Sequence, residues 1–292
     1  MAVIAGPTAS GKSALALEMA VRENGVILNA DASQIYADLP ILSAAPSPDE
    51  QALAPHRLFG VIDGAESCTA ARWAALARTE IAAAHTKGQL PILVGGTGLY
   101  LRTLLDGIAP VPAIPAEVRA DVRALSTEQA RAALEAEDAA MAARLHPNDS
   151  QRNARALEVI RATGRSLAVW QASPPEGGLA AEVTLRPLVV EVPREVLVQR
   201  IDARVDAMWQ AGALDEVRRL DARDLPPTLP VMRAIGVPPL LALLRGKAEA
   251  SESLERWRLE TRQYAKRQAT WARNQTGGWP RVSPSKGAPA AP

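Results

Sequence analysis

The chain has 292 residues, of which 48% are hydrophobic and 22% charged, and its formal net charge is +1 at pH 7. These values exclude a disordered chain and a strongly polybasic one, and the length allows one large α/β domain with an elaboration, or two domains. The single cysteine, Cys68, excludes an internal disulfide framework and a cysteine-based metal cluster. We expect Cys68 at a buried position or a helix start. No apolar run reaches the length of a membrane span, and the first motif leaves no room for a signal peptide, so we expect a cytoplasmic enzyme.

The first motif is a phosphate-binding P-loop that follows the short apolar run 2–5, and it reads Gly6-Pro7-Thr8-Ala9-Ser10-Gly11-Lys12-Ser13. In the spacing G-x-x-x-x-G-K-[ST], the glycines let successive backbone N–H groups point inward, and the helix expected at 14–22 directs its positive end at the anion. Lys12 offers a charge to a terminal phosphate, and Ser13 offers a hydroxyl to Mg²⁺, the expected cofactor. An ordinary glycine-rich turn is the alternative, which the strand, loop and helix context disfavours. The loop is typical of nucleotide-binding proteins but does not identify the phosphate compound.

A candidate active-site loop follows the next strand. Residues 26–30 form a short apolar run suited to a buried parallel strand, and the run delivers Asp31 to its C-terminal end. Open α/β sheets place their ligand chemistry at that end of the strands. The loop 31–36 is therefore a candidate active-site loop. A polar helix cap is the alternative, because Asp and Ser are both good N-caps.

Two further strands are expected in the first part of the chain. Residues 58–62 are strand-like and precede Asp63, which could mimic a Walker B carboxylate. A crossover helix is expected at 69–87 because its apolar residues have helical spacing. Residues 90–94 form the next buried strand and open into Gly95-Gly96-Thr97-Gly98. We expect this turn to let the backbone approach a ligand closely, with Thr97 as a hydroxyl donor.

The composition changes after Gly107, through three prolines, into an Ala/Glu/Arg-rich region at 116–173. This region has helical periodicity and no strand signal, so we interpret it as a helical insertion. An apolar strand at 185–192 then closes the expected sheet. The fold class that follows is α/β, with a P-loop NTPase-like parallel sheet flanked by helices and interrupted by a helical domain. The expected parts are the first part of the core at 1–109, the insertion at 110–182, the second part of the core with basic C-terminal helices at 183–275, and a disordered tail at 276–292.

Basic residues gather in two stretches. Residues 254–275 contain six basic and two acidic side chains, and residues 144–165 contain five and two. One such run is commonly a solvated face, but two of them beside a P-loop favour a nucleic-acid substrate. On the long helix expected at 250–273, basic residues repeat every four positions on one face, whereas an aromatic stripe on another face is expected to pack in the core. The basic residues are Arg258, Arg262 and Lys266, and the aromatic ones are Trp257, Tyr264 and Trp271.

Arg200 and Arg204 stand four residues apart on one face of another expected helix. Such a pair can clamp a phosphate. A solvated face balanced by Asp202 and Asp206 is the alternative.

In these motifs the sequence resembles the tRNA dimethylallyltransferases (tRNA isopentenyltransferases). The resemblance is nearly full length, from Gly6 to Trp271, and it rests on the order and spacing of several blocks rather than on any one of them. Besides the P-loop, the blocks are Asp31 with Gln34-Ile35-Tyr36, Pro55-His56-Arg57-Leu58, Val94-Gly95-Gly96-Thr97-Gly98-Leu99-Tyr100, His146-Pro147-Asn148-Asp149, Arg155-Ala156-Leu157-Glu158, Gly212-Ala213-Leu214-Asp215-Glu216-Val217 and residues 261–271.

The resemblance implies that the helical insertion grips the tRNA anticodon stem-loop and that no membrane is involved. It implies transfer of a dimethylallyl group from dimethylallyl diphosphate to the exocyclic N6 amine of the adenosine adjacent (3′) to the anticodon, by a protein that we expect to be a monomer. Asp31 matches the general base, while Lys12, Thr97 and Arg204 match groups that neutralise the departing diphosphate. Together with the basic stripe, the resemblance predicts tRNA contacts for Asp31, Ser33, Gln34, Gln151, Arg155, Arg258, Arg262, Lys266 and Arg267.

The sequence departs from the family pattern at three places. Ala32 replaces a serine, residues 40–46 lack an Asp, a Gly and a Lys, and residues 235–239 differ from the usual Ile-Gly-Tyr-Lys-Glu. These departures affect substrate contacts more than the reaction. One rival hypothesis is a small-molecule or nucleoside kinase that uses Asp63 or Asp31, which would turn over ATP. Another is a non-catalytic tRNA-binding protein, which leaves the retention of the catalytic residues unexplained.

Overall fold

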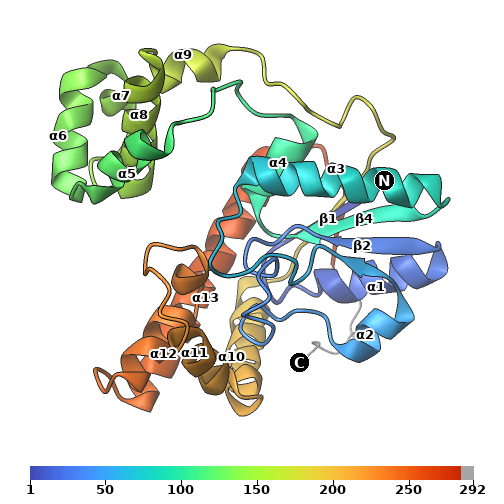
Figure 1. Cartoon of the computed structure of the whole chain (residues 1–292). Coiled ribbons are helices and arrows are strands. Elements are labelled where there is room, and N and C mark those ends of the chain that lie inside the picture. The colour runs from blue at the N-terminus through green and yellow to red at the C-terminus, as the bar shows by residue number, and fades with distance from the viewer. Residues whose placement is uncertain (284–292) are drawn as a thin grey trace. The chain divides into compact units, whose positions relative to one another are not determined.

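The computed structural model describes residues 1–283, which form two compact units (Figure 1). Unit 1 contains Met1–Leu104 and the described chain from Ala180 onward, and unit 2 is Leu105–Leu179. The sequence placed the insertion at 110–182, so the compact helical unit begins and ends a few residues earlier. Backbone hydrogen bonds of 3.0 Å in both directions between Ile108 and Glu176 join the two ends of unit 2, which accounts for the difference.

Unit 1 is built on a parallel sheet with the strand order β3-β2-β4-β1-β5-β6. The central strand β1 pairs Ala5 with Gly95 of β4 and with Val189 of β5. Every residue of β1 and β2 is buried, as is typical of parallel strands covered on both faces. The predicted α/β class with a parallel sheet is therefore confirmed. The strands are β1 (Ala2–Ala5), β2 (Gly25–Asn29), β3 (His56–Arg57), β4 (Leu90–Gly95), β5 (Arg186–Val190) and β6 (Arg281–Val282).

Helices cover both faces of this sheet, with α1 on one face and α3 on the other (Figure 1). The crossover helix predicted at 69–87 is confirmed as α3, and Cys68 immediately precedes its N-cap, Thr69. The terminal helix predicted at 250–273 is confirmed as α13. No described helix is both long and apolar enough to cross a membrane. The helices of unit 1 are α1 (Lys12–Arg22), α2 (Pro48–Leu53), α3 (Ala70–Thr86), α4 (Gly98–Leu105), α10 (Arg194–Gln210), α11 (Ala213–Asp221), the 3-10 turn η1 (Val231–Arg233), α12 (Val237–Leu244) and α13 (Ala250–Gln275).

Unit 2 has a small apolar core of its own, in which Leu134, Met141, Ala156 and Leu157 are buried together. Its elements are helices, as the Ala/Glu/Arg-rich composition predicted. Side-chain caps mark several helix starts, because Ser126, Asp138 and Asp149 are good N-cap residues. The helices of unit 2 are α5 (Ala116–Ala124), α6 (Thr127–Glu137), α7 (Ala139–Arg144), α8 (Ser150–Thr163) and α9 (Leu167–Ala172).

Two predictions at the edges of the sheet are wrong. The strand expected at 58–62 is instead β3, two residues earlier, and the chain turns away at Leu58, whose φ is 66°. The tail expected to be disordered from 276 contains β6, which pairs in parallel with β5 and lies beyond the strand that we expected to close the sheet. The edge of β5 offers unpaired backbone groups, which β6 satisfies. The remainder of the predicted tail, 284–292, lies outside the described residues.

Candidate active site

The P-loop connects β1 to α1, and α1 begins without a side-chain cap. The N-cap residue is Gly11, whose φ of 91° is readily adopted only by glycine. No acidic residue lies in the first turn of the helix. The backbone N–H groups of that turn and the positive end of the helix dipole therefore form a site for an anion.

Two partly buried cations, Lys12 and Arg204, lie beside this helix start. Burial lowers the pKa of Lys12 to about 8, an effect that the charge of Asp31 opposes and the charge of Arg204 reinforces. Burial also lowers the pKa of Arg204, which projects from α10. In the described chain, no carboxylate forms an ion pair with Arg204. Two partly buried cations that form no ion pair with a carboxylate of the described chain indicate where an anionic ligand binds.

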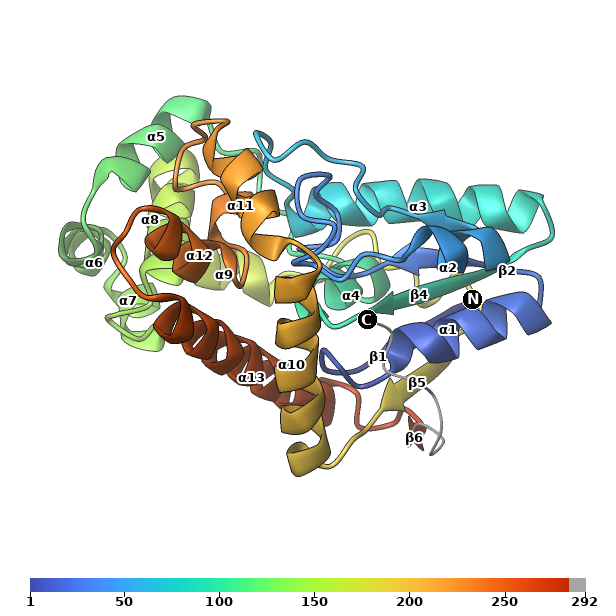
Figure 2. The same ribbon diagram turned by 90° about the horizontal axis from the view of Figure 1, so that it is seen from below.

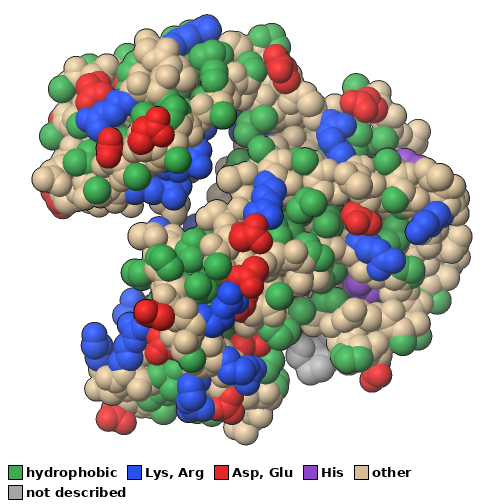
Figure 3. Space-filling model, viewed as in Figure 1, with side chains coloured by type: hydrophobic (Ala, Val, Ile, Leu, Met, Phe, Trp, Pro, Cys, Tyr) green, Lys and Arg blue, Asp and Glu red, His purple; other side chains and the backbone are tan. Residues whose placement is uncertain are grey.

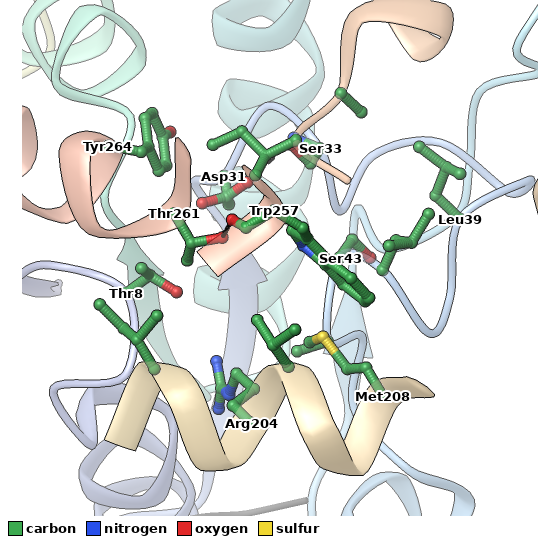
Figure 4. Close-up of a pocket in the computed structure, with 16 residues that line it drawn as sticks. Thr8, Asp31, Ser33, Leu39, Ser43, Arg204, Met208, Trp257, Thr261 and Tyr264 are labelled. Carbon is green, nitrogen blue, oxygen red and sulfur yellow. Dashed lines mark hydrogen bonds between the residues drawn. The ribbon is translucent and has the colours of Figure 1, made fainter. Parts of the chain in front are cut away.

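A cavity opens beside these groups, and Figure 4 shows side chains from several elements around it. Arg204 and Met208 come from α10, and Trp257, Thr261 and Tyr264 come from α13. Thr8 and Asp31 lie on one side of the cavity, whereas Leu39 and Met208 lie on the other (Figure 4). The cavity thus has a polar end next to the P-loop and an apolar end. The apolar stripe of α13 therefore contributes Trp257 and Tyr264 to the site as well as to the core.

Asp31 is held in a fixed turn at the end of β2. Its carboxylate Oδ1 accepts a hydrogen bond of 2.9 Å from the backbone N–H of Ser33, so the side chain does not cap a helix. Asn29, which is fully buried, accepts from the Asp31 N–H at 2.7 Å and donates to the carbonyl oxygens of Asp31 and Leu58 at 3.0 and 2.9 Å. This role of Asn29 was not predicted from the sequence. A polar residue inside an otherwise apolar strand is the signal that could have indicated it.

Thr97 also stabilises the loop that contains Asp31, because its hydroxyl oxygen accepts a hydrogen bond of 2.9 Å from the backbone N–H of Ala32. The glycines around it have a different role from the predicted one. A Cβ at Gly96 would lie 2.0 Å from Gln268 Nε2, and a Cβ at Gly98 would lie 2.2 Å from the ring of Trp271. The expectation that this turn makes room for a ligand is therefore wrong, since α13 occupies the space.

Gln268 joins α13 to the P-loop and was also missed. Its Oε1 accepts a hydrogen bond of 2.8 Å from the backbone N–H of Thr8, and its side chain is buried. Burial and the charge of Asp31 raise the pKa of the neighbouring Tyr264 phenol, which lines the cavity. The bond between Gln268 and Thr8 and the packing of Gln268 against Gly96 fix the position of α13 relative to both the P-loop and the Thr97 turn.

The structure brings only some of the predicted site residues together. Asp31, Ser33 and Arg204 line the cavity with Thr8, and Thr97 contacts the same loop. Gln34 instead braces the cavity wall, because its Nε2 donates to the carbonyl oxygens of Ser43 and Ala44 at 3.1 and 2.7 Å. The joint clamping of a phosphate by Arg200 and Arg204 stays a prediction, since Arg204 lines the cavity and Arg200 Nη1 donates to the Ser10 carbonyl oxygen of the P-loop at 3.4 Å. The alternative, a solvated face balanced by acidic neighbours, is wrong, because Asp202 and Asp206 pair with arginines of α13.

The predicted RNA-binding residues lie in both units, and Lys and Arg side chains (blue) are visible on the surface of each unit in Figure 3. On α13, Lys266 and Arg267 are exposed, and the Arg267 guanidinium lies 5.7 Å from the ring centroid of Tyr264. Arg258 and Arg262 are instead engaged by carboxylates of α10. In unit 2, Gln151 and Arg155 are exposed on α8, and Arg155 also contacts Glu158 at 3.4 Å. For each of these residues, contact with tRNA stays a prediction.

Asp63 does not reach the P-loop site. Its carboxylate is exposed and accepts a 2.6 Å hydrogen bond from Arg223, and it does not line the cavity. The kinase hypothesis therefore loses its Walker B candidate, because a magnesium-binding carboxylate must face the phosphates.

The donor set suits Mg²⁺ that is shared with a phosphate ligand. Ser13 is exposed at the start of α1, and it lines a small cavity together with Gln34 and Arg204. Among residues 1–283, no group of three or more His, Cys, Asp or Glu side chains could hold a metal ion. Mg²⁺ is usually bound through one or two protein groups together with substrate phosphates and water, so this sparse donor set fits that ion.

An uncapped P-loop helix, two partly buried cations and an ordered aspartate at the end of a parallel strand define an α/β enzyme of the P-loop class that acts on a phosphate compound. Within that class the relationship is specific. The model of the IPP transferase family matches residues 34–275, so this chain belongs to that family.

Similar proteins agree with this assignment. The chain is 59% identical to a tRNA dimethylallyltransferase of Sphingopyxis alaskensis over 96% of this chain and 92% of that protein. It is 53% identical to a tRNA dimethylallyltransferase of Zymomonas mobilis over 94% of this chain and 88% of that protein. The crystal structure of the tRNA isopentenylpyrophosphate transferase of Bacillus halodurans matches with a TM-score of 0.68 and 32% identity, over 96% of this chain and 88% of that one. The structure of a eukaryotic dimethylallyltransferase acting on tRNA matches with a TM-score of 0.79 and 28% identity, over 97% of this chain and 73% of that one.

Proposed function

We propose that this protein transfers a dimethylallyl group from dimethylallyl diphosphate to the N6 amine of the adenosine adjacent (3′) to the anticodon in tRNA. The observation that carries the proposal is the anion site formed by the uncapped start of α1 with Lys12 and Arg204, which faces the ordered carboxylate of Asp31 across one cavity. The family membership and the names of the relatives supply the substrates.

The reaction forms a bond between the adenine nitrogen and the allylic carbon and breaks the bond between that carbon and the diphosphate oxygen. The electron pair of the broken bond leaves with the diphosphate, and Lys12, Arg204 and the P-loop N–H groups are placed to neutralise the charge that develops there. The Ser13 hydroxyl would hold Mg²⁺, which would supply further positive charge to neutralise the departing diphosphate. Groups that are fixed in advance need no reorganisation during the reaction.

The adenine amine is a weak nucleophile because its lone pair is delocalised into the ring. A carboxylate that accepts the amine proton as the new bond forms lowers the barrier, and Asp31 is in position to do so. The bond that Oδ1 accepts from the Ser33 N–H and the bond that the Asp31 N–H donates to Asn29 hold the carboxylate in the lining of the cavity. The apolar end, with Leu39 and Met208, keeps water from the allylic carbon and so disfavours hydrolysis of the donor.

The RNA side of the proposal uses both units. The target base must leave its stack to enter a cavity of this kind, as in other enzymes that modify a base. Gln151 and Arg155 on α8 contact the anticodon stem-loop, and Lys266 and Arg267 on α13 contact phosphates or bases near the target. We also propose that the protein acts as a monomer.

Purified protein incubated with labelled dimethylallyl diphosphate, Mg²⁺ and unmodified tRNA tests the proposal. We expect label in the tRNA and release of diphosphate, with no turnover of ATP. Lys12→Ala is expected to raise the barrier by roughly 2 to 4 kcal/mol, the range found for deleting one group that stabilises a developing anion. Phosphoryl transfer from ATP without labelling of tRNA would instead identify a kinase, and binding of tRNA without transfer would identify a non-catalytic protein.

A further inference from the structure

The two helices that form the cavity walls, α10 and α13, are joined by a network of five charged side chains. Arg262 makes a bidentate contact with Asp202, in which Nε donates to Oδ1 at 2.9 Å and Nη2 donates to Oδ2 at 2.7 Å. One helical turn away, Arg258 pairs with Asp206. Glu255 accepts from both arginines, at 3.1 Å from Arg262 and 3.5 Å from Arg258. We call these five residues the α10–α13 ladder.

The α10–α13 ladder engages two of the three residues of the basic stripe on α13 that was predicted to bind RNA. The side chains of Arg258 and Arg262 are only 22% and 28% exposed, and their hydrogen bonds go to carboxylates rather than to solvent. The hydrogen bonds that Arg262 donates to Asp202 raise the pKa of Arg262 above its ordinary value. A phosphate of RNA would have to displace a bidentate carboxylate to bind there, and the released Asp202 would then repel it.

The ladder lies next to the residues that the reaction needs. Arg204 stands between Asp202 and Asp206 in the sequence and projects to the other side of α10, into the cavity. Thr261 precedes Arg262 on α13 and lines the opposite wall. The two helices cross one another in Figure 2, and they also pack through small apolar contacts such as Ile201 with Ala265. Apolar contacts are not directional, whereas a bidentate pair fixes the geometry of a crossing.

We propose that Asp202 and Arg262 are positioning residues, which set the crossing of α10 and α13 and thereby hold Arg204 at the donor diphosphate. Neither residue is then a contact to RNA. This inference rests on the proposed role of Arg204, and it extends the list of residues that the reaction depends on to a pair outside the cavity.

The two roles of Arg262 predict opposite results when Asp202 is neutralised. If Arg262 bound RNA, Asp202→Asn would free its guanidinium, strengthen tRNA binding and leave turnover intact. If the pair is a positioning device, Asp202→Asn and Arg262→Ala will each lower kcat at saturating substrates on the order of tenfold, because small displacements of a catalytic group are costly. The dependence of tRNA affinity on salt, to which each phosphate contact adds a slope of roughly 0.7 to 0.9, will stay unchanged in both variants.

A double-mutant design separates positioning from a general loss of structure. The double variant should be no worse than either single variant, because both remove the same interaction. The exchange of charges, Asp202→Arg with Arg262→Asp, should recover part of kcat. Asp221→Asn is the matched control, since Asp221 accepts a 2.6 Å bond from Arg245 between other helices and lines no part of the cavity. It should leave kcat unchanged.

Two results would overturn the inference, namely an unchanged kcat in Asp202→Asn, or a flatter salt dependence of tRNA binding in Arg262→Ala. The role of Arg204 is tested separately in the same series. Once Arg204 is replaced by Ala, Asp202→Asn should cost no further activity, because the pair acts through Arg204. If Arg204→Ala alone retained full turnover, the proposed role of Arg204 would fail. If Arg204→Ala is impaired and Asp202→Asn is not, only the positioning inference fails.

Discussion

The affinity of the free protein for dimethylallyl diphosphate is expected to fall as the pH rises above 8. Burial places the pKa of Lys12 at about 8 in the absence of ligand. A diphosphate in contact with the ammonium favours the charged form and raises the pKa again, so binding takes up a proton wherever Lys12 was neutral. The terminal phosphate of the donor has its second pKa near 6 and does not titrate above pH 7.

The size of the effect follows from the protonated fraction of Lys12. With a pKa of about 8, the fraction is roughly nine-tenths at pH 7 and roughly one-tenth at pH 9. The dissociation constant should therefore rise about tenfold between these two pH values, which corresponds to about 1.4 kcal/mol. Lys12→Arg is the control, because a guanidinium stays charged throughout this range.

Isothermal titration calorimetry with dimethylallyl diphosphate, without tRNA, measures both quantities. The dissociation constant gives the pH dependence, and the use of two buffers with different ionisation heats gives the number of protons taken up. We expect uptake approaching one proton at about pH 9 in the wild type, and none in Lys12→Arg. An affinity that does not change with pH in the wild type would refute the assignment of Lys12 to the donor diphosphate.

Three further outcomes are expected. Asp31→Asn should preserve binding of both substrates and slow the chemical step by about a hundredfold or more, as for other general bases; equal single-turnover rates would assign the base elsewhere. The buried carboxylate of Glu216 accepts two 2.8 Å bonds from the backbone N–H groups of 41–42, so Glu216→Gln should lower the free energy of unfolding by about 1 to 3 kcal/mol in urea titrations; an unchanged midpoint would contradict this. Gly96→Ala should lower the free energy of unfolding by about 1 to 3 kcal/mol, because the added Cβ clashes with Gln268. A variant that melts at the wild-type temperature in calorimetry would contradict this prediction.

The parts of the fold that depend on local sequence could be predicted. The P-loop has a fixed spacing, and β2 and β4 are mostly apolar runs that form the predicted buried strands. The helical spacing of α3 and α13 also places them correctly. In contrast, β3 and β6 are two residues long and carry no periodicity, so their existence depends on the neighbouring strand rather than on their own sequence.

The contacts that complete the candidate site could not be predicted, because they join residues far apart in the chain. Gln268 reaches Thr8 across 260 residues, and Arg262 reaches Asp202 across 60. From the sequence alone, Arg262 was one member of a basic stripe and Asp202 one member of an acidic pair. Only the packing of α10 against α13 shows that these opposite charges pair with one another. Likewise, only the position of α13 shows that Gly96 and Gly98 make room for that helix.

The most direct test of the central claim is to locate the transferred group. Unmodified tRNA is incubated with the protein, Mg²⁺ and dimethylallyl diphosphate, and its nuclease fragments are then examined by mass spectrometry. We expect one dimethylallyl group, in place of one amine proton, on the adenosine 3′ to the anticodon, and a strongly reduced yield from Arg204→Ala. An unmodified adenosine at that position, or a dimethylallyl group at another nucleotide, would contradict the account.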